Sequence, residues 1–112
     1  MKRFLISFDD GWMRIPDEEL PAVDNAARTV VREAKKAGVW IFGGGLLTQS
    51  ASVVATDGRI TAGPNPETKA VIGGFSIIEV PSREEALTWA AKIAAACRCS
   101  QEVREIMYDP ES

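Results

Sequence analysis

The sequence contains no histidine among its 112 residues, and it has only two cysteines and one tyrosine. Without histidine, the chain lacks both the commonest general acid or base at neutral pH and the commonest metal ligand. Cys97 and Cys99 lie one residue apart, which is too close for an unstrained disulfide, and this pair alone does not complete a tetrahedral zinc site. We therefore expect free thiols, no metal and no cofactor.

Long apolar runs and an excess of positive charge are also missing. No stretch approaches the roughly 20 apolar residues that a membrane helix needs. The basic start of the chain is soon followed by Asp9 and Asp10, where a signal peptide would continue with apolar residues. The formal net charge of -3 argues against a nucleic-acid-binding surface. These features predict a cytoplasmic protein that binds neither membranes nor nucleic acid.

The composition is typical of a globular domain, with 46% hydrophobic and 26% charged residues. A chain of this length buries about two-thirds of its unfolded surface on folding, which is enough to fold without disulfides. We therefore predict a single domain that covers residues 1–112.

Hydrophobic periodicity predicts an α+β fold. Apolar residues alternate in residues 3–8, as in a strand, and recur every three or four residues in two later segments, as in helices. The first helix is expected to start near Pro16 and Asp17 and to end at Lys36, the second runs from a Ser82 cap to Cys97, and further strands are expected at 39–42, 73–80 and 101–108. Asp57 and Gly58 predict a hairpin within residues 52–62. Apart from this inserted hairpin, the order is βαββαβ, the ferredoxin-like unit.

The predicted strands are apolar on both faces of the sheet. Right-handed crossovers place both helices on one face, so the other face should be polar. Instead, Trp40 and Phe42 are expected on one face with Val39 and Ile41 on the other, and Phe75 and Ile77 likewise oppose Ile78 and Val80. We therefore predict a homodimer in which a second sheet covers this face, with a ligand cavity between the two sheets. The alternative is that the hairpin folds back over the face within one chain.

Candidate ligand-binding residues lie around this expected cavity. The loop after the hairpin is rich in proline and charge, and if it crosses the cavity mouth then Lys69 can meet an anionic group. Glu67 shares a side of the extended loop with Lys69, so the two residues can pair or bind a polar ligand, and a solvated ion pair at the rim is the simpler alternative. Asp9 is placed at the rim, with turn formation as the alternative, and Trp40 is placed in the aromatic lining.

The segment GPNPETKAVIGGFSIIEVPSREEALTWA, residues 63–90, resembles the YCII-related family, specifically the branch named for its D-G-P-F motif. The K-K-A-G-V helix end, the G-G-G-L turn and the D-G hairpin also follow the order of that family. The resemblance implies a ferredoxin-like fold assembled as a dimeric α/β barrel, and a bacterial regulatory or stress-linked setting. The motif itself is replaced here by residues 62–65, A-G-P-N, and the catalysis proposed in the wider family uses a histidine that this chain lacks.

Two functions follow as hypotheses. The first is a noncatalytic small-molecule-binding or regulatory dimer. The alternative is a lyase or isomerase that works without a cofactor and uses a buried carboxylate as general acid or base. Whether the protein is an enzyme stays open, and no catalytic residue is assigned from the sequence.

Overall fold

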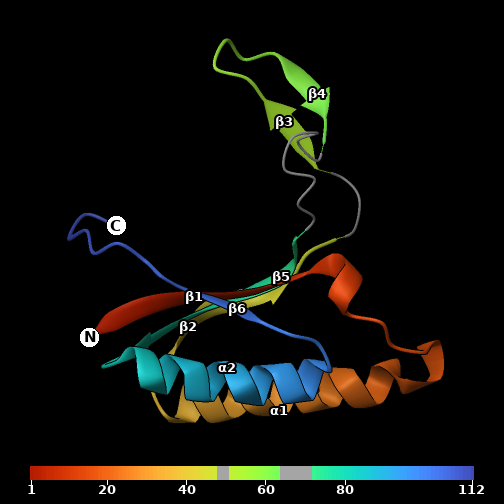
Figure 1. Ribbon diagram of the computed structural model, residues 1–112, viewed down its shortest axis with the longest axis vertical. Coiled ribbons are helices and arrows are strands. Elements are labelled where there is room, and N and C mark those ends of the chain that lie inside the picture. Colours follow the sequence, from red (N-terminus) through yellow and green to blue (C-terminus); the bar gives the residue numbers. More distant parts are fainter. Residues whose placement is uncertain (48–50, 64–71) are drawn as a thin grey trace.

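The computed structural model describes residues 1–47, 51–63 and 72–112 (Figure 1). Its elements are β1 (Lys2–Asp9), η1 (Asp10–Trp12), η2 (Asp17–Glu19), α1 (Leu20–Lys36), β2 (Trp40–Gly45), β3 (Ser52–Val54), β4 (Ile60–Ala62), β5 (Ile72–Val80), α2 (Arg83–Cys97) and β6 (Glu102–Glu105). The predicted order of strands, helices and hairpin is confirmed. No helix within the described residues is long and apolar enough to cross a bilayer.

Four strands form one antiparallel sheet in the order β2-β5-β1-β6. The two central strands are joined along most of their length, with Phe4 opposite Ile78 and Ile6 opposite Ser76. Both helices lie on the same face of this sheet (Figure 1). The connectivity is that of the split βαβ unit, as the element order predicts.

The core lies between the sheet and α2. It consists of Phe4 and Ile6 from β1, Ile78 and Val80 from β5, and Ala86 and Ala90 from α2. The side chains from the two strands are completely buried, and burial of each stabilises the fold by roughly 1.5–3 kcal/mol. The two central strands and one helix therefore provide most of the packing.

The ends of the helices follow local sequence preferences. A 3₁₀ turn precedes α1, so the α-helix itself begins at Leu20 and Pro21 falls in its first turn. Gly38 follows the helix with φ of 76°, a left-handed conformation that glycine adopts easily. At the start of α2, the Ser82 hydroxyl accepts a hydrogen bond from the amide of Glu85 at 3.3 Å. The predicted cap of the second helix is confirmed.

One register shift changes the predicted arrangement of β2. Trp40 pairs with Ile78, and Phe42 pairs with Ile77, so the strand carries an irregularity at Ile41. The extra residue reverses the alternation of side chains. Trp40 therefore packs against the core on the helix face, whereas Phe42 lies on the opposite face. The prediction that these two aromatic residues share a face is wrong for this reason.

The sheet face away from the helices, called the open face below, is apolar at its centre. Leu5, Phe75 and Ile77 are half-buried there, while Phe42 is 63% exposed with its ring centroid 6.0 Å from that of Phe75. Two ion pairs flank the apolar centre, Arg3 with Glu79 at 2.9 Å and Arg104 with Glu102 at 2.8 Å. The predicted apolar character of both sheet faces is confirmed.

The hairpin forms a separate two-stranded sheet from β3 and β4. Its turn follows the Asp-Gly pattern, since the Asp57 carboxylate accepts from the amide of Arg59 at 2.9 Å and Gly58 has φ of 87°. The hairpin projects away from the helices and the larger sheet (Figure 1). It therefore does not cover the open face of its own chain, and that alternative is wrong for this structure.

The last strand is shorter than its alternating pattern predicts. It ends at Glu105, which pairs with Phe4 close to the start of β1. The amide of Ile106 still donates to the carbonyl of Arg3 at 2.8 Å, but beyond this point the neighbouring strand ends. Tyr108 is 84% exposed, because no backbone partner remains to extend the sheet.

Candidate functional site

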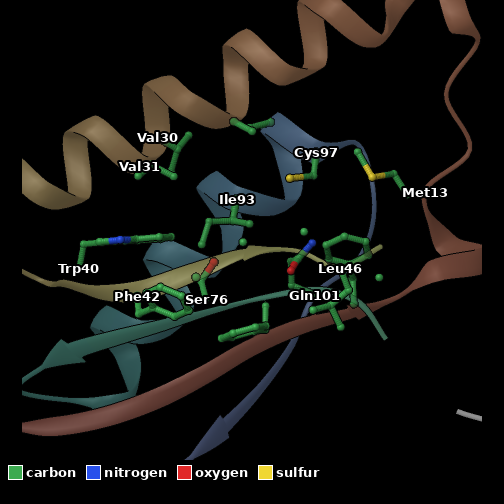
Figure 2. Close-up of a pocket in the computed structure, with 18 of the residues that line it drawn as sticks. Met13, Val30, Val31, Trp40, Phe42, Leu46, Ser76, Ile93, Cys97 and Gln101 are labelled. Atoms are coloured by element: carbon green, nitrogen blue, oxygen red, sulfur yellow. The ribbon is translucent and has the colours of Figure 1, made fainter. Parts of the chain in front are cut away.

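A cavity of about 590 Å³ lies between the sheet and the two helices (Figure 2). Its walls come from α1, α2, β2, β5 and the end of β1, and they are mainly aromatic and aliphatic. The apolar residues of the lining include Phe8, Met13, Val30, Val31, Trp40, Leu46 and Ile93, and the lining also includes Phe42 and Phe75, whose side chains lie on the open face. This size and lining are typical of a small-molecule site.

The cavity exists because glycines leave space beneath α1. Gly43, Gly44 and Gly45 form the second half of β2, and all three line the cavity. Val30 and Val31 of α1 face the cavity and are only half-buried. Because these glycines carry no side chains, the second half of β2 contributes only backbone atoms to the cavity wall.

Phe8 forms one wall by close packing on two further glycines. A Cβ atom built on Gly73 would lie 2.5 Å from a ring carbon of Phe8, and one built on Gly74 would lie 2.9 Å from the same ring. Both distances are shorter than a carbon–carbon contact allows. The aromatic ring therefore lies directly against the backbone of β5, which requires glycine at these positions.

Among the described residues, five polar side chains also line the cavity, namely those of Asp10, Lys35, Ser76, Cys97 and Gln101. The Gln101 amide donates to the carbonyl oxygen and to the sulfur of Cys99, both at 3.4 Å. Burial raises the pKa of the Cys97 thiol, and the neighbouring Cys99 raises this pKa further. The thiol is therefore mainly protonated at neutral pH and acts as a weakly polar part of the wall.

Of the predicted site residues, Trp40 lines the cavity and Asp9 does not. The Asp9 carboxylate instead accepts a hydrogen bond from the amide of Gly11 at 2.8 Å and caps the 3₁₀ turn. Glu67 and Lys69 lie outside the described residues. The space between two sheets, where the sequence predicted a cavity, requires a second copy and stays a prediction.

Asp10 is the cavity residue that sequence reasoning passed over in favour of Asp9. In β1 the even-numbered residues Phe4, Ile6 and Phe8 point toward the helices, as their pairing and burial show. The register is irregular between Phe8 and Asp9, β1 ends at Asp9, and Asp10 begins the 3₁₀ turn η1. The alternation of the strand therefore does not extend to Asp10, and its place at the cavity depends on the turn that follows the strand.

Among the described residues, no group of three or more aspartate, glutamate or cysteine side chains is placed to hold a metal ion. The two cysteines are not joined by a disulfide. The chemistry available at the cavity walls is therefore hydrogen bonding, one carboxylate, one ammonium group and a large apolar surface.

The fold and the cavity define a small α+β domain in which two helices and a four-stranded antiparallel sheet enclose a mainly apolar chamber. Residues 5–108 match the YCII-related domain, so the chain belongs to the YCII-related family.

The structure also resembles that of 5-chloro-2-hydroxyhydroquinone dehydrochlorinase (TftG) from Burkholderia phenoliruptrix AC1100, solved as a complex with 2,5-dihydroxybenzoquinone. The TM-score is 0.53, 97% of each chain is covered, and the sequences are 19% identical. At this identity the likeness shows a shared fold alone. No functionally curated protein matches the sequence.

Proposed function

We propose that this protein is a noncatalytic small-molecule-binding protein with a regulatory role, and that its ligand is a ring compound bound between the sheet and the helices. The observation that carries the proposal is the cavity of about 590 Å³, with aromatic and aliphatic walls and few polar groups. Such sites bury most of a ligand in apolar surroundings and use a few polar groups to orient it.

Two further observations support binding of a ring compound without catalysis. The chain has no histidine, so the histidine-dependent chemistry proposed in the wider family has no equivalent here. The structurally similar dehydrochlorinase was solved with a hydroxylated quinone. A flat ring fits a chamber bounded by the rings of Phe8 and Trp40. From the resemblance of residues 63–90, we further propose that the chain belongs to the D-G-P-F branch of the family. We also propose that the protein works in the cytoplasm.

We further infer that two copies pair through the open face as a dimeric α/β barrel. The face carries Leu5, Phe42, Phe75 and Ile77, and the hairpin of the same chain does not cover it. A stable interface buries about 1,200–2,000 Å² in total, and a twofold pairing of two such faces is self-complementary. In that assembly the segment containing Glu67 and Lys69 belongs to the rim of the space between the sheets, where Lys69 attracts anionic groups.

A carboxylate enzyme is the second candidate, and one observation favours it. Asp10 lines the cavity and is half-buried, so its carboxylate lies where a general base for a bound ring or carbonyl compound is needed. In this scheme Asp10 removes a proton from the ligand; an isomerase returns this proton at another position, whereas in a lyase the freed electron pair forms a double bond as the ligand's own leaving group departs with the electrons of its bond. A lyase or isomerase reaction of this kind needs no cofactor.

The proposal is tested with a substitution that fills the cavity. Val30→Trp places a large side chain from α1 into the chamber, whereas Val54→Trp adds the same side chain on the exposed hairpin. Calorimetric titration with 2,5-dihydroxybenzoquinone and simple hydroquinones should show binding to the parent and to Val54→Trp, and none to Val30→Trp. Equal binding by both variants would exclude the cavity as the site.

Incubation of the protein with the same ring compounds distinguishes the two candidate functions. Samples of protein and ring compound are followed over hours by NMR and mass spectrometry. An unchanged ligand supports the noncatalytic proposal. Conversion that Asp10→Asn abolishes, while the affinity stays measurable, would establish the enzyme and overturn it.

A further inference from the structure

The two charged side chains in the described lining of the cavity have opposite signs and lie at opposite ends. Asp10 follows β1, at the point where the chain leaves the sheet, and Lys35 lies in the last turn of α1. Because α1 runs back along the sheet, its last turn is next to the start of β2 and Trp40. Figure 2 shows the same polarity, with Trp40 on one side of the chamber and Met13 and Gln101 on the other.

The length of α1 that lines the cavity gives the approximate length of the chamber. The cavity is lined by α1 from Ala27 to Lys35, a span of eight residue steps and therefore about 12 Å along the helix axis. Between the two ends, the walls are formed mainly by Val31 and Ile93, which are apolar, with the Ser76 hydroxyl as a neutral polar group among them. The chamber is thus an apolar slot with one polar region at each end.

The end near Asp10 suits a hydrogen-bond donor. An ionised carboxylate only accepts hydrogen bonds, so it favours a hydroxyl or amino group on a ligand and repels an anion. Gln101 belongs to the same end, because it directly precedes β6, whose residue Glu102 pairs with Ser7 of β1. Its side-chain amide adds a second polar contact there.

The end near Lys35 suits an anion. The lysine stem lines the chamber, while the residue as a whole is exposed, so its ammonium group lies at the mouth. Within the part of the chain that the structure describes, neither Asp10 nor Lys35 takes part in an ion pair. Both charges are therefore available to a ligand.

We propose, resting on the function proposed above, that the ligand is an elongated aromatic molecule with a hydrogen-bond donor at one end and an anionic group at the other. It lies along α1, with its donor on Asp10 and its anion toward Lys35. A hydroxyaryl carboxylate has this chemistry. The two charges also fix the direction of binding, because the reversed ligand would place its anion against the Asp10 carboxylate.

Three matched probes test the proposal by calorimetric titration. The probe 4-hydroxycinnamate carries both end groups, cinnamate lacks the hydroxyl, and 4-hydroxycinnamamide replaces the carboxylate with a neutral amide. The variants are Asp10→Asn and Lys35→Met, and the controls are Asp17→Asn and Lys36→Met, which change exposed neighbours outside the cavity.

Each variant should affect only the probes that carry its partner group. Lys35→Met should weaken 4-hydroxycinnamate roughly two- to fivefold, because an exposed charge pair contributes little, and should leave 4-hydroxycinnamamide unchanged. Asp10→Asn should weaken both hydroxylated probes roughly tenfold and should not weaken cinnamate. The control variants should bind all three probes as the parent does.

Two other outcomes overturn the inference in distinguishable ways. Equal binding of all three probes, unaffected by either variant but lost in Val30→Trp, would refute the two-ended ligand and leave the small-molecule site intact. If no probe and no quinone binds, the proposed function fails together with the inference.

Discussion

A single methyl group added to β2 tests how closely this strand packs against the centre of the sheet. A Cβ atom at Gly43 would lie 2.5 Å from the carbonyl oxygen of Phe75 and 2.8 Å from the Cα atom of Ser76. Both are backbone atoms of β5, which is held on its other side by β1. Because β5 has no room to move, Gly43→Ala must push the edge strand outward.

The neighbouring glycine provides the matched control. A Cβ atom at Gly44 would meet nothing within 4 Å. Each substitution reduces the entropy of the unfolded chain by a similar amount, about 0.4–1 kcal/mol in favour of folding. This term cancels in the comparison, so the difference between Gly43→Ala and Gly44→Ala measures overpacking alone. We expect Gly43→Ala to be the less stable by about 1–3 kcal/mol.

The assay is urea unfolding followed by far-ultraviolet circular dichroism. Titrations at two protein concentrations separate any contribution from association, which depends on concentration. A shift in midpoint at constant slope would report a change in stability itself. Equal stabilities for the two variants would refute the close approach of β2 to β5 and, with it, the account of how the cavity wall is built.

Three further predictions concern the open face, a thiol and a strained residue. Phe42→Asp should convert a dimer to monomers in analytical ultracentrifugation, whereas Leu87→Asp, on an exposed side of α2, should not; an unchanged dimer would contradict pairing through the open face. Burial, and secondarily Cys99, raises the pKa of Cys97, so in Cys99→Ala, where burial still acts, its alkylation rate should go on rising with pH beyond about 8.5, where an ordinary cysteine begins to level off. The raised pKa of Cys97 also means that the neutral thiol contributes to the free energy of unfolding at lower pH, and that this contribution is lost as the pH rises through the folded-state pKa. An alkylation rate that levels off like that of an ordinary cysteine would contradict the raised pKa. Arg98→Gly should have a free energy of unfolding about 1 kcal/mol higher than that of Arg98→Ala, and should therefore melt at a higher temperature, because φ of 56° disfavours a Cβ atom. Both variants lose the same ion pair with Glu19, so equal melting temperatures would count against backbone strain.

Local patterns in the sequence were enough to predict the elements of the fold. The alternation in β1, the three-and-four spacing in both helices, the Ser82 cap and the Asp57-Gly58 turn each depend on neighbours within a few residues. The segment 63–90 identified the YCII-related family, which the match over residues 5–108 confirms. Such features can be recognised without knowledge of the rest of the structure.

The candidate site was only partly predictable. The sequence placed Trp40 in the lining of a cavity between two sheets, whereas the structure places it on the helix face, where it lines a different cavity, because the irregularity at Ile41 has no clear mark in the sequence. Asp10 did not follow from the alternation of β1, because the strand is irregular between Phe8 and Asp9 and ends there. Lys35 was interpreted only as part of a helix end, since its place beside the chamber depends on how α1 lies across the sheet.

The sequence by itself determined the element order, the apolar character of both sheet faces and the absence of histidine chemistry, because these depend on residue types and local spacing. Only the tertiary structure decided that a chamber opens on the helix face. A cavity is space that segments distant in the sequence fail to fill. Here the segments are the three glycines of β2, the half-buried side of α1 and the ring of Phe8, which belongs to β1 and packs against β5. That balance of filled and unfilled volume is a property of packing, and no single segment of the sequence contains it.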